Sequence, residues 1–253
     1  MLLPQSFYNR PTLQVARNLL GAVLCRDLTQ TSPQPSPYKG EGGHPTYKMV
    51  PLSLRRRGVR GEVIRCRIVE VETYFGFKDL ASHASRGKTP RNAVMFGPPG
   101  YTYVYFTYGM HYLLNIVTER KNYPAAVLVR AVEPTPPSPP APLPAILLDE
   151  ENYSKKFYHS SLLLRGTQRE EGWGGGGVRV NGPAKLTKFL HIDKSLNSIP
   201  VFTKKHGLWI EAGKETPAAQ IIRAKRVGVD YAGEYKNKLW RFYIKDNKFV
   251  SKK

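Results

Sequence analysis

The sequence predicts a strand-rich domain of the α+β class. Segments rich in β-branched and aromatic residues recur between Gly, Pro, Asn and Ser clusters, which is the pattern of short strands joined by turns. Only two segments carry apolar residues at helical spacing, and no segment is repeated. The chain has 253 residues, of which 41% are hydrophobic, so it can bury a substantial core.

The first helix is expected to open at Asn9-Arg10-Pro11 and to end at Gly21. Proline at the first turn loses no helical hydrogen bond. The apolar face of this helix consists of Leu13, Ala16, Leu19 and Leu20. A short strand over residues 22–28 follows. A second helix is expected to start at Gly182-Pro183, with Leu186, Phe189 and Leu190 on its apolar side.

A long strand is predicted over residues 62–74. Alternation places the following side chains on one face: Ile64, Cys66, Ile68, Glu70, Glu72 and Tyr74. This face changes from apolar to charged halfway along the strand. Such a change is expected where a strand leaves the core and enters a cleft.

Residues 101–107 and 112–118 are expected to form two strands around a tight turn. Tyr101, Tyr103 and Tyr105 share one face of the first strand, which is a common packing arrangement. Tyr108 instead stands at the turn beside Gly109, and an exposed aromatic ring there is suited to insertion between stacked bases. Further strands are predicted at residues 125–132, 208–211, 226–229 and 240–244.

Two segments do not fit this pattern. Residues 31–60 combine Pro- and Gly-rich turns with Arg55-Arg56-Arg57, and residues 134–177 contain a run of prolines and a run of glycines. Neither composition builds a packed core, so we expect a disordered insertion at 31–60 and an irregular one at 134–177. The alternative for the first insertion is a basic flap that binds DNA.

The charge of the chain points to a polyanionic partner. Lys and Arg total 39 and Asp and Glu total 19, which gives +20. Residues 29–61 hold six basic and one acidic residue, a net of +5, so the remainder keeps 20 − 5 = +15. Excess positive charge favours nucleic acid because binding releases counterions.

Composition also bounds the setting of the protein. Cys25 and Cys66 lie far apart in strand-like segments, which predicts buried free thiols, no metal-binding pattern and a reducing, intracellular environment. The first residues lack the features of a signal peptide. No apolar run of about 18 residues predicts a membrane span.

The residues with potential for chemistry lie on the strands. Glu70 and Glu72 share one strand face roughly 7 Å apart, a spacing open to acid–base chemistry or to a solvated strand end. Asn115 and Arg130 are polar residues within apolar strands. A buried Arg130 needs a carboxylate partner, and Glu72 is the obvious one. That pair is either structural or orients a water molecule.

Four runs together are far more specific than any short motif: VEVETYFGFKDLASHA, TPRNAVMF, YVYFTYGMHYLLNI and RVGVDYAGEY. On these runs the chain resembles the alkyladenine (3-methyladenine) DNA glycosylases of the mammalian and bacterial type, not the helix-hairpin-helix type. The resemblance implies one domain over residues 1–253, in which helices surround a curved, mainly antiparallel β-sheet with a protruding β-hairpin.

The resemblance also implies a monofunctional DNA glycosylase of base excision repair. It would flip an alkylated or deaminated purine, such as 3-methyladenine, 7-methylguanine, hypoxanthine or ethenoadenine, and hydrolyse its N-glycosidic bond to leave an abasic site. No lysine stands at the matching catalytic positions, so no lyase step is expected.

Residue roles follow from the same resemblance. Glu72 would be the general base, and Arg130 would help it to hold the attacking water. Tyr74 and His83 would lie on one side of the flipped base and Tyr105 on the other. The remaining expected site residues are Asn115, which would reject guanine, Tyr108, which would fill the gap in the duplex, and Arg91, Met95, Met110 and His111, which would contact DNA.

The expected partner is double-stranded DNA with damaged purines, bound by a monomer without cofactor, metal or membrane. The expected location is the cytoplasm, at the nucleoid of a bacterium, or the nucleus of a eukaryote. Two alternatives remain. A non-catalytic nucleic-acid-binding module explains the charge and the tyrosines but gives no role to Glu72 opposite Arg130. A carbohydrate glycosidase that uses Glu70 and Glu72 leaves the charge of +20 unexplained.

Overall fold

The computed structural model of the protein describes residues 1–30, 63–107, 109–135 and 180–252. These residues belong to one compact unit that joins Met1–Thr135 and Val180–Lys253. The insertion expected at residues 31–60 lies outside the described residues. So do residues 136–177 of the second expected insertion, and Tyr108.

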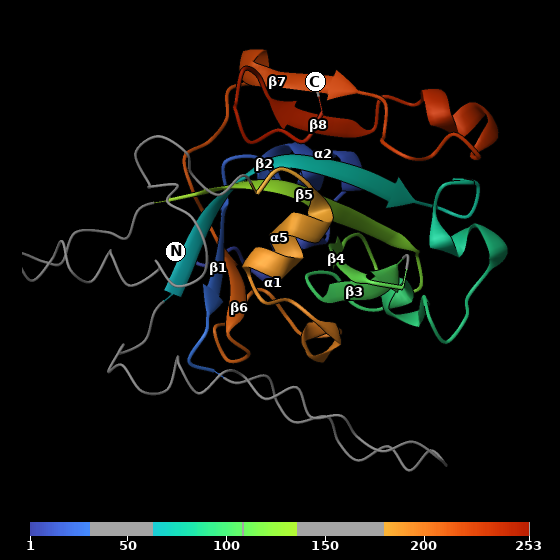
Figure 1. The fold of residues 1–253 in the computed structure, drawn as a ribbon. Helices are drawn as coiled ribbons and strands as arrows, with labels where there is room; N and C mark the ends of the chain where they lie inside the picture. Colours follow the sequence, from blue (N-terminus) through green and yellow to red (C-terminus); the bar gives the residue numbers. More distant parts are fainter. Residues whose placement is uncertain (31–62, 108, 136–179, 253) are drawn as a thin grey trace, which may run out of the picture. The chain divides into compact units, whose positions relative to one another are not determined.

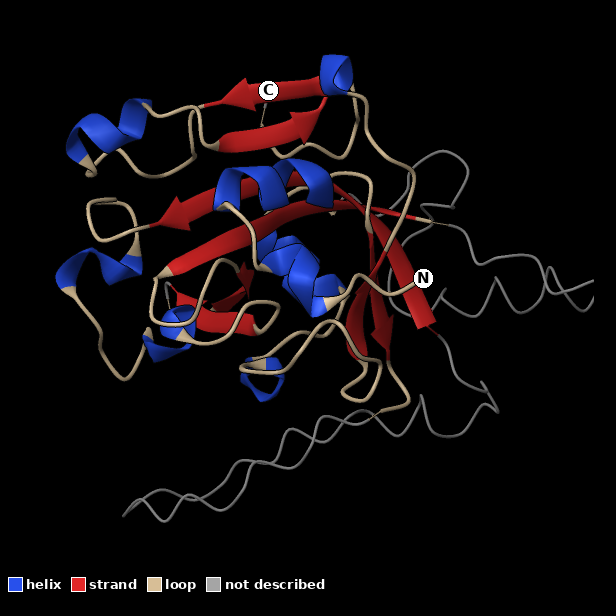
Figure 2. Ribbon diagram, turned by 180° about the vertical axis from the view of Figure 1, so that it is seen from behind, coloured by secondary structure: helices blue, strands red, loops and turns tan. Residues whose placement is uncertain are grey.

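The described strands form an eight-stranded sheet in which every pairing is antiparallel. The order along the sheet is β3-β4-β5-β2-β1-β6, while β8 pairs with β2 and β7 pairs with β8. The sheet curves, with helices around it (Figures 1 and 2), which confirms the α+β class. The strands are β1 (Val23–Asp27), β2 (Val63–Phe75), β3 (Thr102–Thr107), β4 (His111–Val117), β5 (Ala125–Pro134), β6 (Leu208–Glu211), β7 (Ile221–Ala224) and β8 (Arg241–Ile244).

Strand β2 is the longest of these strands, at 13 residues, and it organises the sheet. One edge pairs with β5 from Cys66 to Phe75. The other edge pairs first with β1, through residues 63–67, and then with β8, through residues 70–72. The sheet therefore divides along β2, and the β7–β8 ribbon runs beside the second half of this strand (Figure 1).

The predicted face of β2 is wrong in one respect. Its register with β5 shifts between Ile68 and Glu70 and again between Glu70 and Val71. Cys66, Ile68, Val69 and Val71 consequently belong to the same core cluster, although strict alternation would separate them. A bulge of this kind re-aims the side chains that follow it. The change from apolar to charged thus comes from the shift in register, and the strand stays buried through Thr73.

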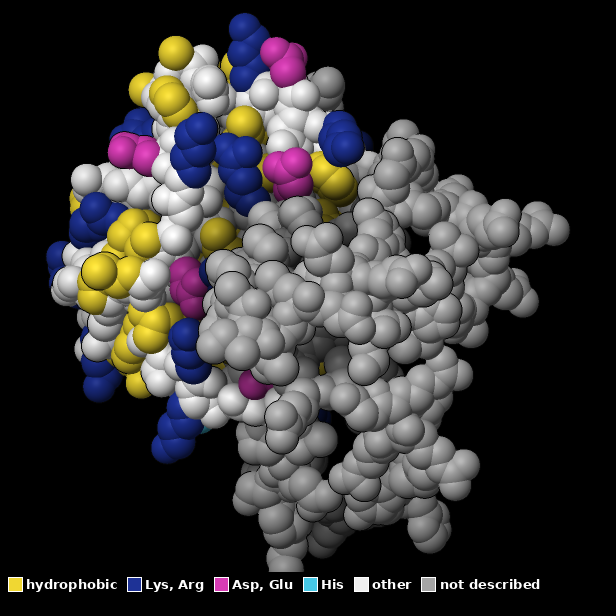
Figure 3. Space-filling view, turned by 90° about the vertical axis from the view of Figure 1, so that its left-hand side faces the viewer, with side chains coloured by type: hydrophobic (Ala, Val, Ile, Leu, Met, Phe, Trp, Pro, Cys, Tyr) yellow, Lys and Arg dark blue, Asp and Glu magenta, His cyan; other side chains and the backbone are white. Residues whose placement is uncertain are grey.

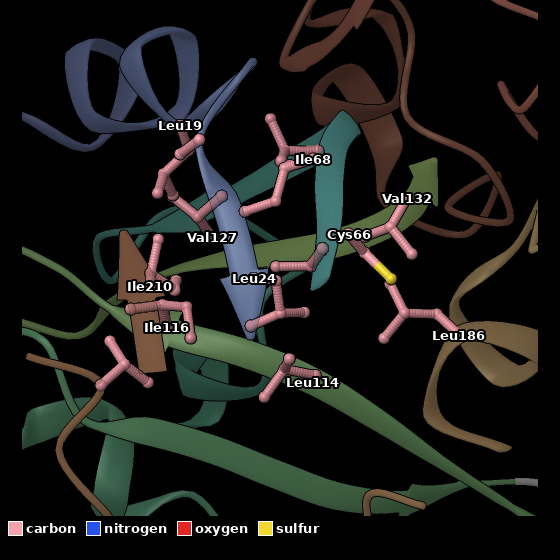
Figure 4. Packing of buried hydrophobic residues seen from close by; sticks show 14 of the residues in the cluster. Leu19, Leu24, Cys66, Ile68, Leu114, Ile116, Val127, Val132, Leu186 and Ile210 are labelled. Carbon is pink, nitrogen blue, oxygen red and sulfur yellow. The ribbon is translucent and has the colours of Figure 1, made fainter. Parts of the chain in front are cut away.

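The α-helices are α1 (Gln5–Tyr8), α2 (Thr12–Leu19) and α5 (Pro183–Phe189). Helix α2 packs on β2 and β5, whereas α5 packs on β4 and β5. Figure 4 shows Leu19 and Leu186 from these helices among the strand residues of the core. Pro11 caps α2 rather than starting its first turn, and Val15 takes a buried place in the apolar face that the prediction omitted. The start of α5 at Pro183 is as predicted.

Short 3-10 helices occupy several connections, including the polar loop after β2. They are η1 (His83–Arg86), η2 (Ala93–Phe96), η5 (Lys194–Leu196), η6 (Ala218–Gln220) and η7 (Gly233–Asn237). The strand expected at residues 226–229 is wrong, because the strand in that region is β7. After it the buried side chain of Arg226 forms an ion pair, and Gly228 at φ +73° turns the chain.

Cys25 and Cys66 are buried free thiols, as predicted. Burial raises the pKa of Cys25 to about 11 and that of Cys66 to about 12, so both stay protonated at neutral pH. No helix among the described residues has the length and apolar character needed to cross a membrane.

Candidate active site

Residues that are distant in the sequence lie in one row across the strands, on the same face of the sheet. Asn115 of β4 is opposite Leu128 of β5, Leu128 is opposite Glu72 of β2, and Glu72 is opposite Arg241 of β8. Directly opposed residues of antiparallel strands point to the same side. Asn115 and Glu72 are therefore two strand spacings apart, roughly 10 Å, on one face.

Glu72 is fully buried and bound by three donors. Its Oε1 accepts a hydrogen bond from the Val227 N–H at 2.7 Å. Its Oε2 accepts from the Tyr74 hydroxyl at 2.8 Å and from Arg130 Nη1 at 3.2 Å. An ionised carboxylate has about four acceptor positions, so roughly one remains for a further donor.

Arg130 lies between both glutamates. Its Nε donates to Glu70 Oε1 at 3.0 Å, while its Nη1 reaches Glu72. Burial alone would lower the pKa of Arg130, but the negative charges of Glu72 and Glu70 outweigh burial and raise it. The predicted partnership of Arg130 with Glu72 is present, and Glu70 shares it.

Tyr74 connects Glu72 to a second buried ion pair. Burial, and then the negative charge of Glu72, raises the pKa of Tyr74 well above its usual value, so its hydroxyl remains a donor. The Arg226 guanidinium lies 4.7 Å from the centre of the Tyr74 ring and 5.0 Å from that of Trp240. Arg226 also donates to both oxygens of Asp79, at 2.7 and 2.8 Å.

Three aromatic side chains lie together where β3 meets η1 and are called the ring group: His83, Tyr103 and Tyr105. His83 Nδ1 lies 2.9 Å from the Tyr103 hydroxyl, and the centre of its ring lies 4.5 Å from that of Tyr105. Removal of water by neighbouring groups, and then the positive charge of Arg91, lowers the pKa of His83 below 6.5. Burial raises the pKa of Tyr103 to about 12. The rings are thus uncharged at neutral pH.

The other predicted residues fall into two groups. Asn115 is buried, and its Nδ2 donates to the Tyr103 carbonyl at 3.1 Å. Met95 is also buried, at 2% exposure, and packs in a core cluster with Tyr103, so the structure does not present it at the surface. Met110 and His111 are exposed beside the hairpin turn, where Gly109 adopts φ +67°.

Arg91 is exposed beside the ring group. Its Nη2 donates to the Phe106 carbonyl at 2.9 Å, and its guanidinium lies 6.0 Å from the centre of the Tyr105 ring. An open groove of about 670 Å³ on the hairpin is lined by Arg91 and Tyr105, together with Lys194. Several Lys and Arg side chains are visible on the described part of the face in Figure 3.

Several contacts were not predicted. The Val227 N–H and the Arg226–Asp79 pair lie within runs that carried the resemblance, but their contacts depend on how the loops fold. Ser251 and Arg241, which both reach Glu70, have no distinguishing pattern in the sequence. Within the described ranges no three His, Cys, Asp or Glu side chains come together as a potential metal site.

Comparisons with known proteins identify the family of the chain. Residues 48–248 match the family described as methylpurine-DNA glycosylase (MPG). A Desulfitobacterium hafniense protein named as a candidate 3-methyladenine DNA glycosylase is 38% identical, over 99% of this chain and 98% of its own. A Methanocella arvoryzae protein of the same name is 38% identical over 100% and 96%, and one from Borreliella burgdorferi is 39% identical over 81% and 92%.

The match spans most of the chain, and these relatives are covered almost from end to end. The chain therefore belongs to the methylpurine-DNA glycosylase family, the hydrolases that remove alkylated purines such as 3-methyladenine from DNA.

Proposed function

We propose that the protein, as a monomer, flips a damaged purine out of duplex DNA and hydrolyses its N-glycosidic bond in base excision repair. The observation that carries the proposal is the Glu72 carboxylate, buried beside Arg130 on the sheet face that also holds Asn115 and Tyr74. The substrates that fit this chemistry are 3-methyladenine, 7-methylguanine, hypoxanthine and ethenoadenine.

Base flipping follows from the position of the reacting bond. A duplex hides the sugar carbon, so the nucleotide must be extruded at a cost of a few kcal/mol, which is smallest for a damaged pair. Stacking on aromatic rings returns about 1–3 kcal/mol per base. The rings of Tyr74, Tyr105 and His83 supply such surfaces.

The ring distances favour a revised placement of the base. A base between two rings needs about two van der Waals separations, roughly 7 Å. His83 and Tyr105 are only 4.5 Å apart, so they act as one wall. The base then lies between this wall and Tyr74, rather than with Tyr74 and His83 on the same side.

Glu72 acts as the general base in this proposal. Its unfilled acceptor position takes the proton of a water molecule, while Arg130 and the Val227 N–H hold the carboxylate. A positively charged alkylated base leaves without further help. Hypoxanthine and ethenoadenine are neutral and need a proton as they leave.

Selectivity and strand separation are assigned to two residues of the hairpin. The amide of Asn115 is fixed by its bond to Tyr103 and rejects the exocyclic amine of guanine. Tyr108 fills the space that the base vacates. Arg91, Met110, His111 and, if its loop opens, Met95 contact the DNA nearby.

A duplex with one labelled lesion tests the proposal. The protein is incubated with a duplex that contains hypoxanthine, ethenoadenine or 7-methylguanine, and half of each sample is treated with alkali. We expect strand breakage only after alkali, because no lysine forms a Schiff base. Breakage without alkali contradicts the monofunctional mechanism. Tight binding without release of any base, by the wild type as by Glu72→Gln, identifies a binding module instead.

A further inference from the structure

Glu70 is the most heavily bound carboxylate of the site and has no place in the mechanism above. It is fully buried, and its Oε1 accepts from Arg130 Nε at 3.0 Å and from Ser251 Oγ at 2.9 Å. Its Oε2 accepts from the Ser251 N–H at 2.6 Å. Arg241 Nη1 lies 3.6 Å from Oε1. Four donor groups thus surround Glu70, one more than bind Glu72, which leaves Glu70 less well placed to activate water.

The same contacts hold Arg130 at three points. Nε is bound to Glu70, Nη1 to Glu72, and Nη2 donates to Ser251 Oγ at 3.3 Å. A guanidinium is planar, so contacts at all three nitrogens fix both its position and its plane. Two of the three contacts come from outside Glu72, through Glu70 and Ser251.

The segment around Ser251 is itself held in place. Arg241 Nη2 donates to the Lys252 carbonyl at 2.7 Å, and the Phe249 N–H donates to Asn247 Oδ1 at 2.8 Å. Val250 is buried at 7% exposure. This short segment after β8 is therefore fixed against Glu70.

The charges of the cluster balance. Glu70 and Glu72 carry two negative charges, and Arg130 and Arg241 carry two positive ones. Arg130 presents only Nη1 to Glu72, because its Nε is occupied by Glu70. Without Glu70, Arg130 is free to rotate onto both oxygens of Glu72 as a bidentate pair, which is the preferred arrangement of these groups. Such a pair would occupy the acceptor position that the water needs.

We infer that Glu70 and Ser251 are positioning residues that hold Arg130 in a single-point contact with Glu72 and so keep Glu72 open to water. The inference rests on the proposed function, since it needs Glu72 as the base. It gives Ser251 a part in positioning the catalytic residues, although Ser251 is far from Glu72 in the sequence.

Single-turnover kinetics on a hypoxanthine duplex test the inference in the full chain. Glu70→Gln keeps the shape of the side chain and removes its charge, and we expect the rate constant to fall about 10- to 100-fold, as for loss of a hydrogen bond to a charged group. Ser251→Ala removes only the hydroxyl contact, and we expect a fall of about 2- to 10-fold. The enzyme concentration that gives half the maximal rate should not change.

Lys252→Ala is the matched control, because its side chain is exposed and the carbonyl bound by Arg241 is kept. It should cleave at the wild-type rate. Ser251→Pro additionally removes the N–H bound by Glu70 and should be slower than Ser251→Ala. If Glu70→Gln fails to fold, the two Ser251 variants still decide the matter.

A double-mutant comparison separates positioning from general stability. In an Arg130→Met background, Glu70→Gln and Ser251→Ala should cause no further loss of rate, because their target is absent. Additive losses would overturn the inference. So would wild-type rates in the single variants, even with lowered melting temperatures. Either result leaves the proposed function intact as long as Glu72→Gln is inactive, whereas a wild type that releases no base refutes both.

Discussion

Two buried ionic clusters lie side by side in this protein, and they are built differently. Arg226 and Asp79 form a one-to-one pair, fully buried, with both oxygens of Asp79 bound by the guanidinium. The cluster of Glu70, Glu72, Arg130 and Arg241 instead shares two guanidinium groups between two carboxylates. Tyr74 joins the clusters, since its hydroxyl binds Glu72 and its ring lies against Arg226.

This difference suggests that one cluster supports the fold and the other takes part in the reaction. Asp79 is bound by both ends of one guanidinium and by the Ala81 N–H, and these contacts join the loop after β2 to Arg226, so we assign the pair to holding neighbouring structure. Arg226 precedes Val227, whose N–H binds Glu72, and Arg226 also donates to the Thr73 carbonyl. In the shared cluster, Glu72 keeps an open position. The first cluster should therefore govern stability and the second catalysis.

The largest expected effect is on the rate of base release in Glu72→Gln. The amide cannot take the proton of water, and general-base catalysis contributes about 10²- to 10⁴-fold, so the single-turnover rate should fall by that amount. The urea midpoint should fall less than in Asp79→Asn, because Arg130 keeps Glu70 as a charged partner. A variant that retains most of the rate, or that loses its fold, would remove the distinction between the two clusters.

Asp79→Asn should reverse that pattern. Removing one partner leaves Arg226 as an uncompensated buried charge, which costs about 3–5 kcal/mol of unfolding free energy. Urea denaturation measures this loss. Folded enzyme, assayed well below its midpoint, should keep a rate within about tenfold of wild type, because the groups that bind Glu72 remain.

The matched control for this change is Glu133→Gln. Glu133 pairs with Arg67 at 3.8 Å, and both side chains are about 30% exposed. Ion pairs of this kind contribute about 0–1 kcal/mol. Equal losses of unfolding free energy in Asp79→Asn and Glu133→Gln would show that burial does not determine how much these ion pairs stabilise the protein.

The contrast between the clusters also explains which parts the sequence could predict. Glu72, Arg130 and Tyr74 were identified because charged residues in apolar strands are unusual and because the runs around them are specific. The shift in register at Glu70 was not predictable, since it arises where β1 and β8 follow one another along the same edge of β2. Alternation alone grouped Cys66 and Ile68 with the glutamates. In the structure both residues belong to the core cluster that also contains Val71.

Contacts made by backbone groups could not be predicted from the sequence either. Val227 acts through its N–H group, and Ser251 does so in part, and every residue except proline possesses such a group, so the residue type gives no indication of this role. The prediction for residues 226–229 failed for a related reason. A strand was predicted there, but the chain turns at Gly228, and Arg226 is bound by Asp79, a residue distant in the sequence.

A smaller effect should come from the pH dependence of His83, which lies against Tyr103 and Tyr105. Its pKa is lowered below 6.5, so the ring is neutral at pH 7 and gains a proton only as the pH falls below that value. The groups that face it are the charged guanidinium of Arg91 and the uncharged phenols of Tyr103 and Tyr105. A protonated ring would repel a cationic 7-methylguanine, and binding should weaken about fivefold on acidification, the size of an interaction of about 1 kcal/mol.

Binding of a 7-methylguanine duplex from pH 5 to 8 measures this change. The inactive Glu72→Gln background keeps the lesion intact during the titration. Adding His83→Gln should remove the acid-side weakening, while a hypoxanthine duplex, whose base is neutral, should show little of it in either protein. The same acid-side loss in the presence and absence of His83 would assign it to another group.

The smallest effect is expected at an exposed cation, where neither cluster is touched. Among the described residues, the exposed Arg91 side chain contacts the Phe106 carbonyl and the face of Tyr105, so Arg91→Ala should leave the urea midpoint and the maximal rate near wild type. DNA affinity should fall a few-fold, and the slope of log affinity against log salt should decrease by about one unit if one phosphate contact is lost. Arg91→Lys should restore the slope, because the charge returns. A different outcome is a slower maximal rate at saturating enzyme with an unchanged salt slope. Arg91 would then act on the ring group through Tyr105. Buried ions would no longer account for the chemistry alone, and exposed ions for DNA attraction alone, on this side of the hairpin.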